Sequence, residues 1–362
     1  MQENGLIAIV KRDCPPCVMI APVLQEILQS NELTIFTQDD PGFPEGIEGI
    51  SDDTSLDASY RLNVEIVPTV VRVERGGEIS RTYGWDRAEW EKVVGTTGLG
   101  MSLPDFTPGC GALNQEQDRL ADLRIRHGDT PMTSRLVPLG AKEDAIEACY
   151  ERGWSDGLPV VPPTQERVLA MLEGTTRDAE ELMGLLPSNL DPCTVEKVAI
   201  NAVMAGCKPE YLPVVLAAVE AMCTDEFNIH GVSATTMGGT PAVIINGPIR
   251  EKIEMNSGLG ALGAGHRANA TIGRAIRLVL RNIGGAKTGG TERSTLASPS
   301  KYTLAFAERE ERSPWEPYHV QHGFDQTESV VTLFAVTGGP SLVVDQNSRT
   351  PEQITGLSLI HI

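Results

Sequence analysis

Basic residues are scarce in this sequence, and it contains no long hydrophobic run. The 362 residues include 30 Lys and Arg against 49 Asp and Glu, which gives a formal net charge of −19. Phosphate surfaces need clustered basic side chains, so we expect neither nucleic acid nor a membrane as a partner. No apolar run approaches the roughly 18 residues that cross a bilayer, and the first residues lack the basic region of a secretory signal. We therefore expect a cytoplasmic protein.

Cysteine is also sparse, and one pair alone has a chemically meaningful spacing. The seven cysteines form an odd, scattered set that does not describe a disulfide scaffold. Cys14 and Cys17, separated by two prolines, lie between an apolar run and a helical pattern. Such a pair either exchanges disulfides or forms half of a zinc site. The sequence has no second Cys-x-x-Cys and no His-x-x-x-His to complete a zinc site, so we predict a redox dithiol without metal or cofactor.

The length predicts two α/β domains, because a single core of usual size holds fewer residues. In the N-terminal part, apolar runs predict strands, and apolar residues at helical spacing predict helices that cover them. The predicted order is a strand at 6–10, a helix from Cys17, a strand at 34–37, a second helix, strands at 69–73 and 79–83, and a helix from 86 to 94. Asp86 and Glu89 form the N-cap pair of the last helix, and Pro22 is expected to kink the first.

This order and two local motifs resemble the thioredoxin family over residues 5–95. The helix from Cys17, with its kinking proline, resembles the thioredoxin active-site helix, and Val67-Pro68-Thr69 resembles the cis-proline strand that faces the dithiol. The resemblance implies a thioredoxin-like fold in which Cys14 is the nucleophile, Cys17 the resolving thiol and Pro68 the cis residue. The opening strand and helix of a full thioredoxin have no counterpart, so this is either a minimal variant or a truncated one.

The position of Cys14 also predicts its reactivity. A thiol at a helix N-terminus faces unsatisfied N–H groups and the positive end of the helix dipole, which lower its pKa. Lys11 and Arg12 favour the thiolate, whereas Asp13 opposes it and stands where the family has a tryptophan. Ala8 occupies the position of the family's buried aspartate, which removes a proton acceptor for the resolving thiol. We therefore expect an atypical centre that acts as a dedicated electron carrier.

A stretch rich in Gly, Thr, Ser and Pro begins at Gly95 and predicts a domain boundary. We assign residues 1–95 to the first domain and 96–130 to a linker. Cys110 lies in this linker on a turn flanked by glycines, and an accessible thiol there is a candidate exchange partner for Cys14. The alternative is a lightly packed cysteine without a role, because nothing near it in sequence lowers its pKa.

Residues 131–356 predict a larger mixed α/β domain. Its candidate anion-binding residues are Gly258, Gly260, Gly263, Arg267 and Arg274. These glycines precede a helix, and the arginines recur every seven residues along it, so the guanidinium groups line up on one face. The alternatives are a mobile loop and a solvated or salt-bridged face. Asp156, in a rigid loop, is either catalytic or a turn residue.

Polar residues at every third position give this domain a candidate metal site. They are Glu316, His319, His322 and Asp325. Two imidazoles and two carboxylates can bind a metal ion, but Pro317 and Gly323 argue against a helix that would align them, which favours ordinary loop polar residues. Residues 357–362 look like translated read-through of a sequencing adapter, and we assign no role to them.

Residues 110–356 resemble an uncharacterised bacterial family that is found beside or fused to thioredoxin-like modules. The segments that carry this resemblance are 156–164, 196–206 and 265–270. It implies no established activity. We therefore expect a thiol-disulfide oxidoreductase module that acts on a protein or small-molecule disulfide and serves the second domain as electron donor, with intramolecular exchange between the two. Two alternatives stay open: an enzyme whose main anion- or metal-binding site lies in the second domain, and a redox-sensing interaction protein.

Overall fold

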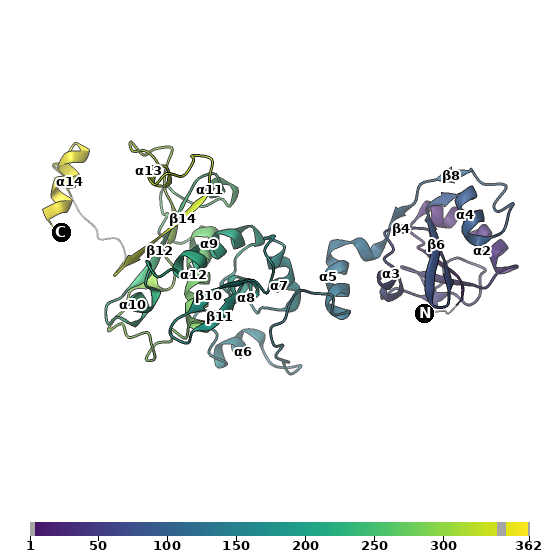
Figure 1. Cartoon of the computed structure of the whole chain (residues 1–362), viewed down its shortest axis with the longest axis horizontal. Coiled ribbons are helices and arrows are strands. Elements are labelled where there is room, and N and C mark those ends of the chain that lie inside the picture. Colours follow the sequence, from purple (N-terminus) through teal and green to yellow (C-terminus); the bar gives the residue numbers. More distant parts are fainter. Residues whose placement is uncertain (1–3, 339–344, 361–362) are drawn as a thin grey trace. The chain divides into compact units, whose positions relative to one another are not determined.

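The computed structural model describes residues 4–338 and 345–360, and the chain divides into two compact units, Met1–Thr130 and Pro131–Ile362 (Figure 1). Both units combine helices with small sheets, so the mixed α/β class is confirmed. Each unit has its own cluster of buried apolar side chains. The first unit extends to Thr130, so the expected linker at 96–130 is part of this unit instead of a separate segment.

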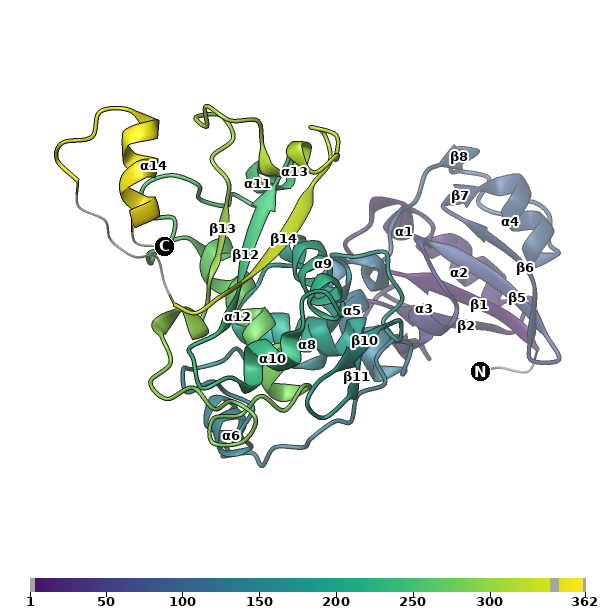
Figure 2. The same cartoon turned by 60° about the vertical axis from the view of Figure 1, so that its left-hand side comes forward.

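The first unit is built on a sheet with the strand order β3-β2-β1-β5-β6 (Figure 2). The strands are β1 (Gly5–Val10), β2 (Leu33–Thr37), β3 (Ser51–Asp52), β5 (Thr69–Glu74) and β6 (Gly77–Tyr83). β1 is parallel to β2 and antiparallel to β5, and Ala8 pairs with Ile35 on one side and with Val70 on the other. This central position explains why β1 is a continuous apolar run, since both of its faces are covered.

Two short helices, α1 (Pro15–Met19) and α2 (Ala21–Leu28), follow β1. Pro22 lies in the first turn of α2, where its missing N–H costs no intrahelical bond, so the expected kink is a break between two helices. The other helices of the sheet region are α3 (Asp57–Arg61) and α4 (Arg87–Val94). Asp86 caps α4 by accepting the Glu89 N–H, which confirms the predicted cap.

Two short antiparallel ladders attach residues 104–116, which we call the strap, to the first unit. β7 (Trp85–Asp86) pairs with β8 (Phe106–Thr107), and β4 (Ile66–Val67) pairs with β9 (Cys110–Gly111). The turn η1 (Leu113–Gln115) and the helix α5 (Gln117–Arg126) follow. One of the glycines that suggested a linker, Gly109, serves close packing here. A β-carbon at Gly109 would overlap the Ile66 side chain, so only glycine fits that contact.

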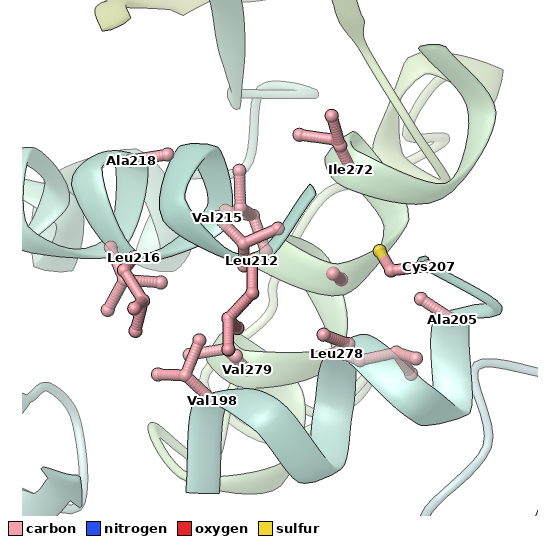
Figure 3. Packing of buried hydrophobic residues seen from close by; sticks show 14 of the residues in the cluster. Val198, Ala205, Cys207, Leu212, Val215, Leu216, Ala218, Ile272, Leu278 and Val279 are labelled. Atoms are coloured by element: carbon pink, nitrogen blue, oxygen red, sulfur yellow. The ribbon is translucent and has the colours of Figure 1, made fainter. Parts of the chain in front are cut away.

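The core of the second unit lies among α8 (Val195–Ala205), α9 (Leu212–Met222) and α12 (Arg267–Asn282), and Figure 3 shows side chains from all three meeting there. Thr194 caps α8 by accepting the Lys197 N–H, and Gly206 ends the helix with a φ of +88°. A sheet has the order β13-β12-β14, with β13 (Ala305–Ala307), β12 (Thr240–Asn246) and β14 (Val330–Val336). β12 is parallel to β13 and antiparallel to β14.

The other elements of the second unit are shorter. They are α6 (Ala145–Glu151), α7 (Gln165–Leu172), the β10 (Leu182–Leu186) and β11 (Asp191–Thr194) hairpin, η2 (Pro209–Tyr211), α10 (Ile229–Ala234), α11 (Ile249–Lys252), η3 (Pro299–Lys301), α13 (Tyr318–Gln321) and α14 (Pro351–Ile360). The suspected artefactual tail begins within α14, and His361 lies outside the described residues. Within the described ranges, no helix is long and apolar enough to cross a membrane.

Candidate functional site

The candidate site begins where the buried strand β1 ends. Cys14 is the N-cap residue of α1, with extended backbone angles, and its carbonyl oxygen accepts the Val18 N–H at 3.1 Å. Pro15 at the first helical position needs no hydrogen-bond acceptor, so the two prolines are compatible with this helix start. The Cys14 side chain is buried, with 1% of its surface exposed. The nucleophile predicted from sequence is therefore at a helix N-terminus but covered.

The surroundings of Cys14 lower its pKa to about 6. The largest cause is a hydrogen bond from the Cys17 thiol, and burial opposes it. Further lowering comes from the Cys110 thiol, from the Cys17 backbone N–H and from the positive charge of Lys11. Each of these stabilises a negative sulfur, so the thiolate of this cluster resides on Cys14.

Cys17 has the opposite character. Its side chain is fully buried in the first turn of α1, and burial followed by the neighbouring Cys14 raises its pKa. Cys17 is therefore protonated while Cys14 is the thiolate. This suits a resolving cysteine, which loses its proton only when it attacks the mixed disulfide on the nucleophile. Ala8 is itself buried in β1 and contributes no carboxylate.

Pro68 follows Val67, the residue whose carbonyl oxygen contacts Cys14. The Val67–Pro68 peptide bond is cis, which is the isomer that the resemblance implies. The Cys14 sulfur lies 3.6 Å from the Val67 carbonyl oxygen, to which it donates a hydrogen bond when it is protonated. The site thus joins the end of β1, the first turn of α1 and the short strand β4.

Cys110 is the third thiol of the site. In the β4–β9 ladder it pairs directly with Val67, the residue whose carbonyl receives the Cys14 thiol. Burial, followed by the hydrogen bond to Cys14, raises the pKa of Cys110 to about 11. The structure therefore places Cys110, the predicted exchange partner, beside Cys14, the predicted nucleophile. The segment around Cys110, predicted to be a turn between two glycines, forms the short strand β9 instead.

Lys11 binds the strap by a hydrogen bond, and its positive charge also lowers the pKa of Cys14. Its ammonium group is largely buried and donates to the Gly111 carbonyl at 2.9 Å. The other charges predicted to act on Cys14 are directed elsewhere. Arg12 forms ion pairs with Asp40 and Glu45, and the charge of Asp13 raises the pKa of Cys110.

A buried polar network, which the sequence did not predict, fixes the chain after Cys110. The Gln38 amide donates to Ser59 at 2.8 Å and to Asn114 at 3.1 Å, and it accepts the Leu113 N–H at 3.0 Å. Asn114 in turn donates to the Val64 carbonyl at 2.8 Å. These residues are widely separated in sequence and share no spacing, so no local pattern identifies them. Together they attach the strap beyond Cys110 to the chain just before β4.

The candidate anion-binding residues of the second unit are engaged in internal contacts. The Arg274 guanidinium binds both carboxylate oxygens of Asp156 at 2.8 Å and also donates to two carbonyl groups. Arg267 donates to the Gly206 carbonyl at 2.9 Å. In the glycine loop, the N–H groups of Gly258 and Gly263 donate to neighbouring loop atoms. For Arg274 and Asp156, the geometry favours the salt-bridged face and the turn residue over a binding or catalytic role.

The two histidines considered as metal ligands lie in different surroundings. His319 is 1% exposed, and its nearest charged partner is Glu310, at 3.9 Å from Nδ1. His322 is exposed, bonds the Tyr318 carbonyl at 2.8 Å and packs against the Tyr318 ring. Among the described residues, no group of three or more His, Cys, Asp or Glu side chains is arranged to hold a metal ion.

The second unit also contains a cavity that the sequence did not reveal. Its volume is about 980 Å³, and most of its lining is apolar, including Trp154, Ile200 and Met204. Glu196 holds part of its wall by accepting the backbone N–H groups of Thr133 at 3.2 Å and of Ser134 at 3.0 Å. A cavity of this size is adequate for a small organic ligand.

Two comparisons with known proteins complete the description of the site. No protein-family model matches the chain, and no curated protein matches it.

Proposed function

We propose that the first unit is a thiol-disulfide exchange module of the thioredoxin type, with Cys14 as nucleophile and Cys17 as resolving thiol. The observation that carries this proposal is the position of Cys14 at a helix N-terminus, hydrogen-bonded by a second thiol one turn later, with its pKa lowered to about 6. At that pKa, roughly nine tenths of Cys14 is thiolate at neutral pH, against a few per cent for an ordinary thiol.

The topology around the dithiol supports the thioredoxin type. The dithiol follows the central strand β1, which is flanked by a parallel strand and an antiparallel one. The antiparallel β5 begins directly after Pro68, and β6 continues the sheet beyond it. This order of elements and the juxtaposition of Val67 with Cys14 are those that the family resemblance implies.

The proposed reaction reduces a disulfide in two steps. The Cys14 thiolate attacks one sulfur of the substrate disulfide, so a Cys14–substrate disulfide forms and the other substrate sulfur leaves as a thiolate. Cys17 then loses its proton and attacks the Cys14 sulfur, which releases the remaining substrate thiolate. The substrate gains two electrons and leaves as two thiolates, one of which can take the proton that Cys17 loses while the other takes its proton from water, and Cys14–Cys17 becomes the disulfide.

A redox titration of the full chain tests this function. After equilibration in glutathione buffers of graded potential, we expect a reversible Cys14–Cys17 disulfide, detected by non-reducing peptide mapping. Cys14→Ser removes it, whereas Cys223→Ser, which changes a partly buried thiol of the second unit, leaves it intact. A reduced protein that forms neither this disulfide nor a glutathione adduct at Cys14 would contradict the proposal.

The cavity of the second unit favours a second function, which is the binding of a small and mainly apolar molecule. Its apolar lining and its volume of about 980 Å³ support this assignment. Because both units belong to one chain, we propose that the dithiol supplies electrons to chemistry in the second unit. Binding of an apolar fluorescent dye tests the cavity: Ile200→Arg should abolish it, Ile354→Arg on α14 should not, and absence of dye binding by the unaltered chain contradicts it.

A further inference from the structure

The edge of β4, beside the dithiol, is already occupied by the protein's own strap. β9 pairs antiparallel with β4, so that Cys110 pairs with Val67 and Gly111 with Ile66. The next residue continues the pairing, because the Ala112 N–H donates to the Glu65 carbonyl at 3.0 Å. An extended segment with a cysteine opposite Val67 therefore lies where an incoming peptide disulfide would pair with β4.

Contacts on both sides of Cys110 hold the strap in place. Before Cys110, the Trp85 indole N–H donates to the Pro104 carbonyl at 2.6 Å. After it, Lys11 binds the Gly111 carbonyl at 2.9 Å, and Asn114 is bound within the buried polar network. Cys110 is therefore presented to Cys14 by an ordered backbone, which favours reaction between the two sulfurs over reaction with a thiol from solution.

The nucleophile itself is covered. Cys14 is 1% exposed and Cys17 is fully buried, whereas Cys110 is partly exposed. A disulfide from outside therefore meets Cys110 more easily than it meets either thiol of the Cys14–Cys17 pair. Cys110 is the member of the cluster that can contact both Cys14 and an external partner.

We propose that Cys110 is a third redox-active thiol, which carries the disulfide between the covered dithiol and an external thiol or disulfide. This inference rests on the proposed function of Cys14 and Cys17. Starting from oxidised Cys14–Cys17, the Cys110 thiolate attacks the Cys14 sulfur, so the Cys14–Cys110 bond forms and the Cys14–Cys17 bond breaks. Cys17 leaves as a thiolate and takes up one proton, which balances the proton that Cys110 lost. Because one disulfide replaces another, no external oxidant is needed.

The exchange with the partner is balanced in the same way. An external thiolate attacks the Cys110 sulfur, a Cys110–partner disulfide forms, and Cys14 leaves as a thiolate. Cys14 is suited to leave, because the low pKa of a thiol makes it the faster leaving group. The partner is identified by this chemistry as a thiol or disulfide compound small enough, or extended enough, to reach the strap.

Mapping of disulfides in the full chain tests the proposal. Reduced Cys17→Ser and Cys17→Ser/Cys110→Ser proteins are exposed to oxidised glutathione, quenched with acid, alkylated and mapped without reduction. In Cys17→Ser we expect a Cys14–Cys110 disulfide, because the ordered thiol displaces glutathione from Cys14. In the double variant we expect the Cys14–glutathione adduct to persist, at least about tenfold more abundant than in Cys17→Ser. Cys17→Ser/Cys223→Ser is the matched control and should behave like Cys17→Ser.

Two results would overturn the inference, and they are distinguishable. If Cys17→Ser accumulates the Cys14–glutathione adduct as fully as the double variant while Cys110 stays a free thiol, Cys110 has no redox role, and the proposed function of Cys14 survives. If Cys14 forms no adduct in any variant and no disulfide in the unaltered chain, the proposed function itself fails and the role of Cys110 fails with it.

Discussion

Substitution of Gly109 by alanine should open the strap and expose Cys14. A β-carbon at Gly109 would overlap the Ile66 Cγ2 atom and would lie 2.7 Å from the Val67 carbonyl oxygen. Both neighbours belong to β4, the strand that pairs with β9, and one of the two atoms is backbone, so the clash cannot be relieved by a flexible side chain. Gly111 is the matched control, because a β-carbon there meets nothing within 4 Å.

The size of the effect follows from the contact. Overpacking by one methyl group in a well-packed site costs about 1–3 kcal/mol. Separation of β9 from β4 relieves that cost, so the substitution shifts the equilibrium between covered and open Cys14 by about the same amount. An equilibrium shift of about 1–3 kcal/mol corresponds to a roughly 5- to 150-fold change in the open population. Because Cys14 is 1% exposed, its alkylation requires opening and should accelerate by this factor.

The assay is alkylation of the reduced full chain by iodoacetamide, with the modification of each cysteine followed by mass spectrometry. Cys17 is fully buried in the same unit and reports global unfolding, so it should stay unmodified while Cys14 reacts. We expect Gly111→Ala to alkylate Cys14 within about twofold of the unaltered protein, since a surface substitution without clashes changes stability by under about 0.5 kcal/mol. Equal Cys14 rates in Gly109→Ala and Gly111→Ala, with both proteins folded, would refute the view that the strap covers the nucleophile.

Three further predictions concern charge. The ultraviolet absorbance of the Cys14 thiolate, taken as the difference from Cys14→Ser, should be present at neutral pH and disappear as the pH falls through about 6, because a lowered pKa keeps the thiolate down to that pH. Lys11→Met should move this midpoint upward by removing a positive charge near Cys14, whereas Lys92→Met, which changes an exposed ion pair, should not move it. Asp156→Asn should destabilise the full chain to urea by on the order of 3 kcal/mol, because it leaves the largely buried Arg274 without its carboxylate; an unchanged urea midpoint would show that this ion pair contributes nothing.

Local patterns in the sequence predicted most elements near the dithiol. The strand before Cys14 follows from a run of neighbouring apolar residues, and Pro22, predicted to kink the helix, lies just after the break between α1 and α2. The caps at Asp86 and at Thr194 are equally local, since a side chain there bonds an N–H three residues on. Such features can be predicted because their energies depend on neighbours along the chain.

Residues 96–130 were predicted as a linker, and they lie within the first compact unit. Glycine and proline mark loops when little else is known of their surroundings, yet Gly109 is needed for a close approach between two strands that the sequence does not pair by itself. The helix that carries Arg274 was predicted, but the partner of that arginine, Asp156, lies in a distant loop. The charge pattern alone therefore left both a binding role and a structural role open.

The spacing of Cys14 and Cys17 and the helical periodicity after them are local features, and they suffice to predict a dithiol at the start of a helix. The position of Cys110 beside this dithiol and the burial of Cys14 follow from the three-dimensional fold. Both features depend on the pairing of β9, which follows β8 in the strap, with β4. They also depend on the hydrogen bonds of Lys11 and Gln38 that hold the strap in place. Contacts between residues far apart in sequence are set by packing and hydrogen bonding in three dimensions, and no local pattern encodes them.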